Sequence, residues 1–483
     1  MTPSLVLVTI AFYFLILYAI SFIAGKKSDN QGFFVGNRKS PWFVVAFAMI
    51  GSSISGVTFV SVPGMVGTSS FSYLQMVLGF VVGQFLIAYV LVPLFYKLNL
   101  VSIYGYLEER FGYSSHKTGA WFFFISKMLG AAVRLFLVCL TLQLLVFEAL
   151  HLPFILNVAF TVALVWLYTF RSGVKSLIWT DSLKTFCLVT SVGLCIYFIA
   201  SGLHLSFGEM ISVINKSDMS RMFFFDDVND KRFFFKQFLG GVFTMIAMTG
   251  LDQDMMQRNL SCKNSKDSQK NIIISSVMQF FVNLLFLMMG VLLYMYAAQN
   301  GIGNPAKSDE LFPMIATGGF FPVVVGILFV VGLISSAYAA AGSALTALTT
   351  SFTIDILGTE GKSEEQVKQT RKRVHVGMAV VMGLVIFIFN LVNNTSVIDA
   401  VYTLASYTYG PILGMFVFGI FTKRSVKDKF IPVVAILSPI LCYVLQSHSA
   451  EWFNGYKFSY ELLIFNALFT FVGFWILSGK KNY

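Results

Sequence analysis

Long apolar runs constrain this sequence more than any other feature. A membrane-spanning helix needs about 20 mostly apolar residues in a row. We count thirteen runs of this kind in the 483-residue chain, at 4–23, 43–65, 71–96, 120–149, 153–170, 176–202, 233–252, 272–298, 320–351, 373–391, 396–421, 430–446 and 459–477. The runs predict an all-α, multi-pass integral membrane protein with about thirteen transmembrane helices in a lipid bilayer.

The composition agrees with lipid as the main surroundings of the chain. Hydrophobic residues make up 57% and charged residues only 12%, whereas an ordinary soluble protein is roughly 25% charged. These values exclude a soluble enzyme, a disordered scaffold and a nucleic-acid-binding protein. The sequence has no CxxC pair, no HExxH pair and no Walker A loop, so it predicts neither a zinc site nor an ATP-driven pump. We therefore expect that the chain is not an enzyme.

The distribution of basic residues predicts the orientation of the chain. Of the 34 Lys and Arg residues, 24 follow the odd-numbered runs or lie in the C-terminal tail, and 7 lie in the other loops, with Arg373 and Lys236 at the starts of two runs counted with the loops before them. Because basic residues gather on the cytoplasmic side of a membrane, the N-terminus is expected outside and the C-terminus inside. The net charge of +11 then has a topological cause and needs no nucleic-acid partner.

Two of the apolar runs are interrupted by glycines and polar residues. The run 43–65 contains GSSISGVT at 51–58, and the run 233–252 ends in MTGLDQD at 248–254. Such clusters are typical of discontinuous helices at substrate and ion sites. Close helix packing also explains the first cluster, and the cytoplasmic boundary of the membrane explains the acids of the second, Asp254 above all. The two runs are five segments apart, which is the spacing of an inverted five-plus-five repeat.

This spacing gives a domain organisation. We expect a single membrane domain that comprises an extra N-terminal helix, a first repeat, a second repeat and two extra C-terminal helices, over 1–25, 43–202, 233–421 and 430–477 of residues 1–483. The connection 203–232 is expected to lie along the outer face as a short amphipathic piece.

A few polar residues lie deep inside apolar runs. The adjacent Ser335 and Ser336 offer two hydroxyls to a hard cation, which prefers oxygen ligands, although close packing also explains a row of small residues. A lone Arg134 at mid-depth costs about 2.5–3.5 kcal/mol. It forms either an internal ion pair, with Asp252 or Asp181, or a bidentate clamp on a substrate carboxylate.

Three sequence segments resemble a known family. They are YT..SGVKSLIWTD at 168–181, DQDMMQR at 252–258 and SIYGYLEERF at 102–111. In this order and spacing they resemble the signature segments of the sodium:solute symporter family, and the likeness extends over about 30–425. The resemblance implies a LeuT-type fold and secondary active transport driven by Na⁺, with alternating access to the two sides of the membrane.

The resemblance also implies an ion site. The family's best-shared sodium site uses backbone carbonyls of the broken first core helix and of the eighth, together with two hydroxyls of the eighth. The matching positions in this sequence are Gly51, Ile54, Gly332, Ser335 and Ser336. Some members hold a second sodium with the aspartate at the position of Asp181. The hydroxyls expected one turn further on are replaced here by Tyr338 and Ala339, so one sodium is expected.

The substrate is predicted from the same resemblance. Arg134 matches a carboxylate-binding arginine of the bacterial sialic acid symporters, and Ser53, Ser55 and Thr58 match hydroxyls that face their substrate. Their substrate-contacting glutamine falls near Val77, so Gln75 would have to substitute for it. For a zwitterionic solute, Asp252 would hold the amine.

The predicted function is import of a small carboxylate with sodium. A sialic acid or a monocarboxylate fits best, and a zwitterionic amino acid or a sugar is the alternative. A channel is a more remote alternative. A transporter-like sensor is also more remote, because the short tail leaves no room for a signalling domain. We expect the solute, Na⁺ and lipid as partners, with no nucleic acid and no obligate protein partner, in a bacterial inner membrane.

Overall fold

The apolar runs fold into helices throughout the computed structural model. The model describes residues 3–25, 40–100, 102–170, 174–303, 305, 308–359, 361–392 and 397–479. The helices are α1 (Pro3–Gly25), α3 (Trp42–Ser53), α4 (Gly56–Ser69), α5 (Tyr73–Leu86), α6 (Val92–Lys97), α7 (Gly105–Arg110), α8 (Tyr113–Leu142), α9 (Phe154–Thr169), α10 (Val174–Gly202), α11 (Phe207–Lys216), α12 (Phe234–Met245), α13 (Gln253–Asn259), α14 (Ser265–Gln299), α15 (Leu311–Thr317), α16 (Val323–Ser351), α17 (Glu364–Val392), α18 (Val397–Phe421), α19 (Ile431–Ser447), α20 (Ser449–Trp452) and α21 (Leu462–Leu477). Strands β1 (Ser425–Val426) and β2 (Ser478–Gly479) form one short antiparallel pair.

Nine helices of the described residues are long and apolar enough to cross a membrane. Two bent helix pairs raise the number of candidate spans to eleven: α3 with α4, bent by 56°, and α12 with α13, bent by 73°. These are the two runs for which the sequence predicts discontinuous helices, so both breaks are confirmed. The apolar helices α9 and α21 are shorter, with 16 residues each.

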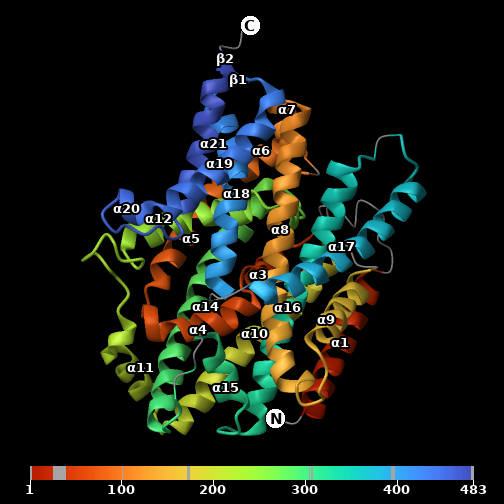
Figure 1. Ribbon diagram of the computed structural model, residues 1–483. Coiled ribbons are helices and arrows are strands. Elements are labelled where there is room, and N and C mark those ends of the chain that lie inside the picture. Colours follow the sequence, from red (N-terminus) through yellow and green to blue (C-terminus); the bar gives the residue numbers. More distant parts are fainter. Residues whose placement is uncertain are drawn as a thin grey trace.

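The broken pair α3 and α4 lies in the middle of the helix bundle (Figure 1). Helix α10 packs against α3 and α16, α14 packs against α4, and α18 packs against α8. The other broken helix, α12, packs along α5. Helix α1 joins the bundle through α10 and α16, and α19 and α21 pack on each other and on α18. The start of α1 and strand β2 lie at opposite ends of the molecule (Figure 1).

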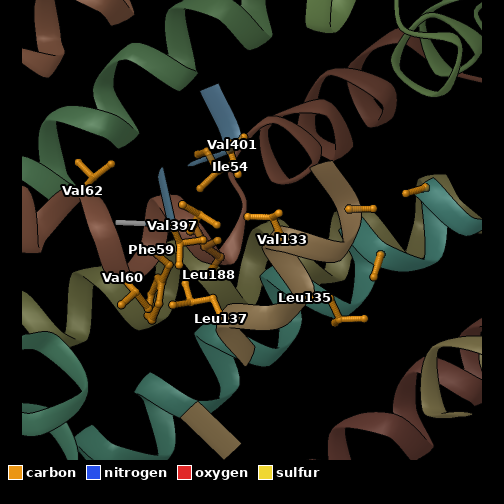
Figure 2. Close-up of a cluster of buried hydrophobic side chains, with 14 of the residues drawn as sticks. Ile54, Phe59, Val60, Val62, Val133, Leu135, Leu137, Leu188, Val397 and Val401 are labelled. Carbon is orange, nitrogen blue, oxygen red and sulfur yellow. The ribbon is translucent and has the colours of Figure 1, made fainter. Parts of the chain in front are cut away.

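A buried apolar cluster connects the breaks to the surrounding helices. Figure 2 shows Ile54, Phe59 and Val60 from the broken pair in one cluster with Leu137 of α8 and Leu188 of α10. All five are almost completely buried. The outward faces of the bundle are also apolar, as on α19, where Leu437, Ile440 and Leu441 are about half exposed. Such faces suit contact with lipid, as expected of an integral multi-pass membrane protein.

Helix α11 lies in the connection for which the sequence predicts an amphipathic piece. Ser206 and Glu209 form a reciprocal capping box at its start, and Met210 and Ile214 form its buried face. Hydrogen bonds from the hydroxyl and the backbone N–H of Ser206 hold the pKa of the Glu209 carboxyl below its ordinary value. The capping box therefore fixes where this helix begins.

Candidate functional site

The break between α3 and α4 frees backbone oxygens in the centre of the protein. Ile54 and Ser55 are extended, with φ and ψ of −91° and 110° and of −95° and 171°. The hydrogen-bond ladder of α3 ends with the N–H of Ile54 donating to the carbonyl of Ile50, and the next bond runs from Phe59 to Ser55. The last carbonyls of α3, from Gly51 to Ile54, therefore have no helical donor. They are suited to bind a cation.

Gly51 lies where α3 touches α10. A Cβ atom on Gly51 would lie 2.2 Å from the Thr185 hydroxyl oxygen and 3.1 Å from the carbonyl oxygen of Asp181. The Thr185 hydroxyl donates to the carbonyls of Phe47 and Asp181, at 2.9 Å each. The glycine thus permits an approach of the two helices that a larger residue would prevent.

The other predicted sodium ligands lie on α16 and are fully buried. The Ser335 hydroxyl donates to the carbonyl of Gly332 at 3.0 Å, and the Ser336 hydroxyl donates to Leu333 at 2.9 Å. A Cβ atom on Gly332 would lie 2.5 Å from the Phe59 ring, so α16 meets α4 there. Of the five predicted ligands, Ile54 lines the central cavity described next, and the other four do not.

A cavity of about 90 Å³ lies beside the break. Five of the six predicted substrate residues line it. Four belong to the first repeat, Ser53, Ser55, Thr58 and Arg134, and the fifth is Asp252 at the break of the second broken helix. No hydrogen bond is made by the hydroxyls of Ser53, Ser55 or Thr58 within the described part of the chain. These hydroxyls are therefore free to bind a solute.

The structure does not bring Gln75 to the cavity. Its side-chain nitrogen donates to the carbonyls of Ser72 and Arg232, and its oxygen accepts from the N–H of Phe224. The side chain is fully buried, and these three bonds satisfy it. Gln75 therefore links the connection before α12 to the start of α5. The structure does not support its prediction as a substrate ligand.

Arg134 of α8 is the one predicted cation of the cavity wall. Its side chain is partly exposed and lines the cavity. Within the described ranges its guanidinium makes no hydrogen bond and no ion pair. The two acids that the sequence suggests as internal partners, Asp181 and Asp252, are each paired with another residue. The structure therefore leaves the guanidinium available to a ligand.

Next to the cavity, and partly lining it, buried charged residues from three helices form a continuous network. Asp181 of α10 pairs with Arg258 of α13 at 3.1 Å, and Arg258 pairs with Asp254 at 3.0 Å. Lys127 of α8 joins Asp254 at 2.9 Å to Asp252 at 3.0 Å. Each of these five residues is at most 4% exposed. Asp181, Arg258, Asp254, Lys127 and Asp252, in this order of contact, are called the charge chain below.

Hydroxyl groups complete the charge chain at its two ends. The Tyr409 hydroxyl of α18 donates to Asp252 at 2.6 Å. At the other end, the Ser52 hydroxyl donates to Asp181 at 3.2 Å and also contacts Arg258. Asp252 additionally accepts from the N–H of Met255 and so caps α13. The chain therefore ties both broken helices, at α3 and α13, to α8, α10 and α18.

Sequence reasoning missed several residues of this site. Asp254, which the sequence places at the cytoplasmic boundary, is buried in the charge chain and pairs with Lys127 of α8. Lys127, like Arg134, is a basic residue inside an apolar run. Its position alone could therefore have indicated a buried ion pair or a binding site. On the side of α5 and α18, the hydroxyls of Tyr73 and Tyr402 meet at 2.9 Å and line the cavity.

The chain is similar to known proteins in both sequence and structure. The model of the sodium:solute symporter family matches residues 33–428. The chain is 26% identical to a sodium/sialic acid symporter of Aliivibrio fischeri, over 87% of this chain and 84% of that protein. It is 24% identical to a sodium/sialic acid symporter of Proteus mirabilis, over 88% and 86%. A solved outward-open structure of a Na⁺-coupled sialic acid symporter superposes with a TM-score of 0.83 and 19% identity, covering 98% of this chain and 99% of that one.

Proposed function

The chain belongs to the sodium:solute symporter family, and from this premise we propose that its solute is a small carboxylate held by Arg134. Membership makes the chain a sodium-coupled symporter and not an enzyme. The superposition with a solved relative establishes the LeuT-type fold. Sodium and solute cross together as the central site opens alternately to the two sides, with the charge chain as part of the inner closure.

The observation that carries the proposed substrate is the Arg134 guanidinium in the cavity wall, which has no hydrogen bond or ion pair with the residues that the structure describes. A guanidinium presents two parallel N–H donors that match a carboxylate. An arginine kept in the membrane without a partner is costly, and a bound anion would remove this cost. The free hydroxyls of Ser53, Ser55 and Thr58 supply hydrogen bonds for the rest of the solute.

A sialic acid or a monocarboxylate fits this site better than the alternatives. The relatives in Aliivibrio fischeri and Proteus mirabilis carry the name of sialic acid symporters, and a sialic acid combines a carboxylate with hydroxyls. A zwitterionic amino acid would need Asp252 for its amine, but Lys127, Tyr409 and the N–H of Met255 already bind that carboxylate. A sugar would leave the charge of Arg134 without a partner.

The proposed sodium site joins the break to α16. Its ligands are the carbonyls of Gly51, Ile54 and Gly332 and the hydroxyls of Ser335 and Ser336. Two observations support it: the break leaves the first two carbonyls without helical donors, and both hydroxyls are buried on the helix that meets α4. Sodium bound there would hold the broken helix against α16, and sodium and solute would each tighten the binding of the other.

The finer topology is part of the proposal. We count α9 and α21 as two further spans, which brings the eleven candidate spans to thirteen. The N-terminus lies outside and the C-terminus inside, in a bacterial inner membrane. Residues 43–202 and 233–421 form the two inverted repeats, with 1–25 and 430–477 as additional helices of one domain. A broken helix at the start of each half supports this division.

A thermal-shift panel tests the proposed substrate class. The purified protein is heated with sialic acid, lactate, pyruvate, a neutral amino acid and galactose, each in NaCl and in choline chloride. The proposal predicts that a carboxylate raises the melting temperature in NaCl and has little effect in choline chloride. Stabilisation by galactose alone, or equal stabilisation in both salts, would contradict it.

A further inference from the structure

Lys184 of α10 is buried next to the charge chain but takes no part in it. Its side chain is 0% exposed, and Nζ has no hydrogen-bond partner among the residues that the structure describes. It lies three positions after Asp181 on the same helix, so both side chains lie on one face, one turn apart. A buried ammonium without a bonded partner is costly and requires an explanation.

Asp181 has one carboxylate oxygen with partners and one without. One of its oxygens, Oδ2, accepts from Ser52 at 3.2 Å and pairs with Arg258 at 3.1 Å. The other, Oδ1, is buried and has no hydrogen-bond partner in the described part of the chain. Four charged side chains act on Lys184, those of Asp181, Arg258, Arg134 and Asp254, and the attraction to Asp181 is the strongest of these four interactions.

The charges of this region balance only when Lys184 is included. The charge chain contains three carboxylates, of Asp181, Asp252 and Asp254, and two cations, of Lys127 and Arg258. Lys184 supplies the third cation and makes the buried group neutral. Without it the group would carry one net negative charge, which a protein interior disfavours.

We propose that Lys184 is a tethered cation that occupies the electrostatic place of a second sodium at Asp181, so that the transporter moves one sodium per solute. The inference rests on the sodium symport and carboxylate substrate proposed above. A mobile sodium at Asp181 would face Arg258 on Oδ2 and Lys184 one helical turn away. Repulsion from two fixed cations disfavours a third positive charge there.

This arrangement has a consequence for energetics. One sodium and one monoanion carry no net charge across the membrane, so uptake is driven by the sodium gradient and not by the membrane potential. A second sodium would make the same uptake electrogenic and sensitive to voltage. The presence of Lys184 therefore determines whether uptake is driven by the sodium gradient alone or also by the membrane potential.

The test compares four proteins in proteoliposomes: the wild type, Lys184→Gln, the charge-neutral double variant Asp181→Asn/Lys184→Gln, and Lys216→Gln. The last removes a positive charge from the exposed end of α11 and is the matched control. Uptake of the monoanion that the thermal panel identifies is measured against sodium concentration. It is then repeated with a valinomycin-imposed, inside-negative potential.

The wild type and the Lys216→Gln control should respond to sodium with a Hill coefficient of about 1 and show no acceleration by the potential. Lys184→Gln leaves Asp181 with a spare charge, so its Hill coefficient should rise toward about 2 and its uptake should become voltage-sensitive. The double variant removes that charge again. It should return to a Hill coefficient of about 1, with half-maximal sodium within about twofold of the wild type.

Two results would overturn the inference. One is a voltage-sensitive wild type with a Hill coefficient of about 2 that falls to about 1 in the double variant, because Asp181 would then bind a sodium natively. The other is a Lys184→Gln protein that behaves as the wild type does. If Lys184→Gln does not fold, comparison of the wild type with the double variant still tests the first outcome, a native sodium at Asp181. Uptake by the wild type that needs no sodium would instead refute the proposed function.

Discussion

Replacing Arg134 by lysine should weaken carboxylate binding without destabilising the empty transporter. Lysine keeps the charge but loses the paired donors that match a carboxylate. A hydrogen bond to a charged group is worth about 1.5–3 kcal/mol, which corresponds to a loss of affinity of roughly 10- to 150-fold. Arg134→Ala should lose more, because no cation then faces the anion.

The effect on stability distinguishes a substrate clamp from a structural ion pair. Arg134 has no ion pair or hydrogen bond within the described ranges, so its replacement breaks no polar contact there. Lys127, seven positions earlier on α8, is the matched control because it pairs with both Asp252 and Asp254. Lys127→Met leaves these buried acids without that partner, which costs about 3–5 kcal/mol.

The assay is thermal unfolding of the purified proteins with and without a stabilising carboxylate in NaCl. Arg134→Lys should melt at the wild-type temperature in the empty state and require at least about tenfold more carboxylate for half-maximal stabilisation. Lys127→Met should melt at a clearly lower temperature in the empty state. The reasoning is refuted if Arg134→Lys lowers the empty-state melting temperature as much as Lys127→Met does, or retains wild-type affinity.

Two further predictions concern the ion site. Ser335→Ala should raise the sodium concentration for half-maximal uptake about tenfold or more, since a hydrogen-bonding group facing a charge is worth about 1.5–3 kcal/mol. Thr346→Ala, which removes a buried hydroxyl of the same helix, should leave that concentration unchanged, and equal shifts in both variants would argue against the site. Gly51→Ala should lower the melting temperature, because its Cβ would lie 2.2 Å from the Thr185 oxygen and overpacking costs about 1–3 kcal/mol. Gly193→Ala, with no atom in reach of its Cβ, is the control; a Gly51→Ala protein as stable as this control would refute the packing argument.

The sequence predicts the two broken helices because their cause is local. Glycines and hydroxyl residues at 51–58 weaken a membrane helix whatever surrounds it, and the bend of 56° lies at that cluster. The same holds for Arg134, since its cost in lipid is evident from its position in an apolar run. Such features can be predicted from the sequence without knowledge of the tertiary contacts.

The charge chain is beyond sequence reasoning for a physical reason. Lys127 and Asp252 are 125 positions apart, and only the tertiary fold brings the two side chains within 3.0 Å of each other. The burial of Asp254 could not be predicted, because the sequence does not reveal the direction in which the chain bends after the break. Gln75 fails similarly, since its partners Arg232 and Phe224 belong to a connection about 150 positions away whose path no local pattern fixes.

The central claim is sodium-coupled uptake of a carboxylate, and one measurement tests it directly. Proteoliposomes that contain the protein are loaded with potassium buffer and diluted into sodium buffer with the radiolabelled carboxylate that stabilises the protein most. The account predicts accumulation above the external concentration that requires the inward sodium gradient and persists when a protonophore is added. Equal uptake with choline in place of sodium, or collapse of accumulation by the protonophore while the sodium gradient is intact, would contradict it.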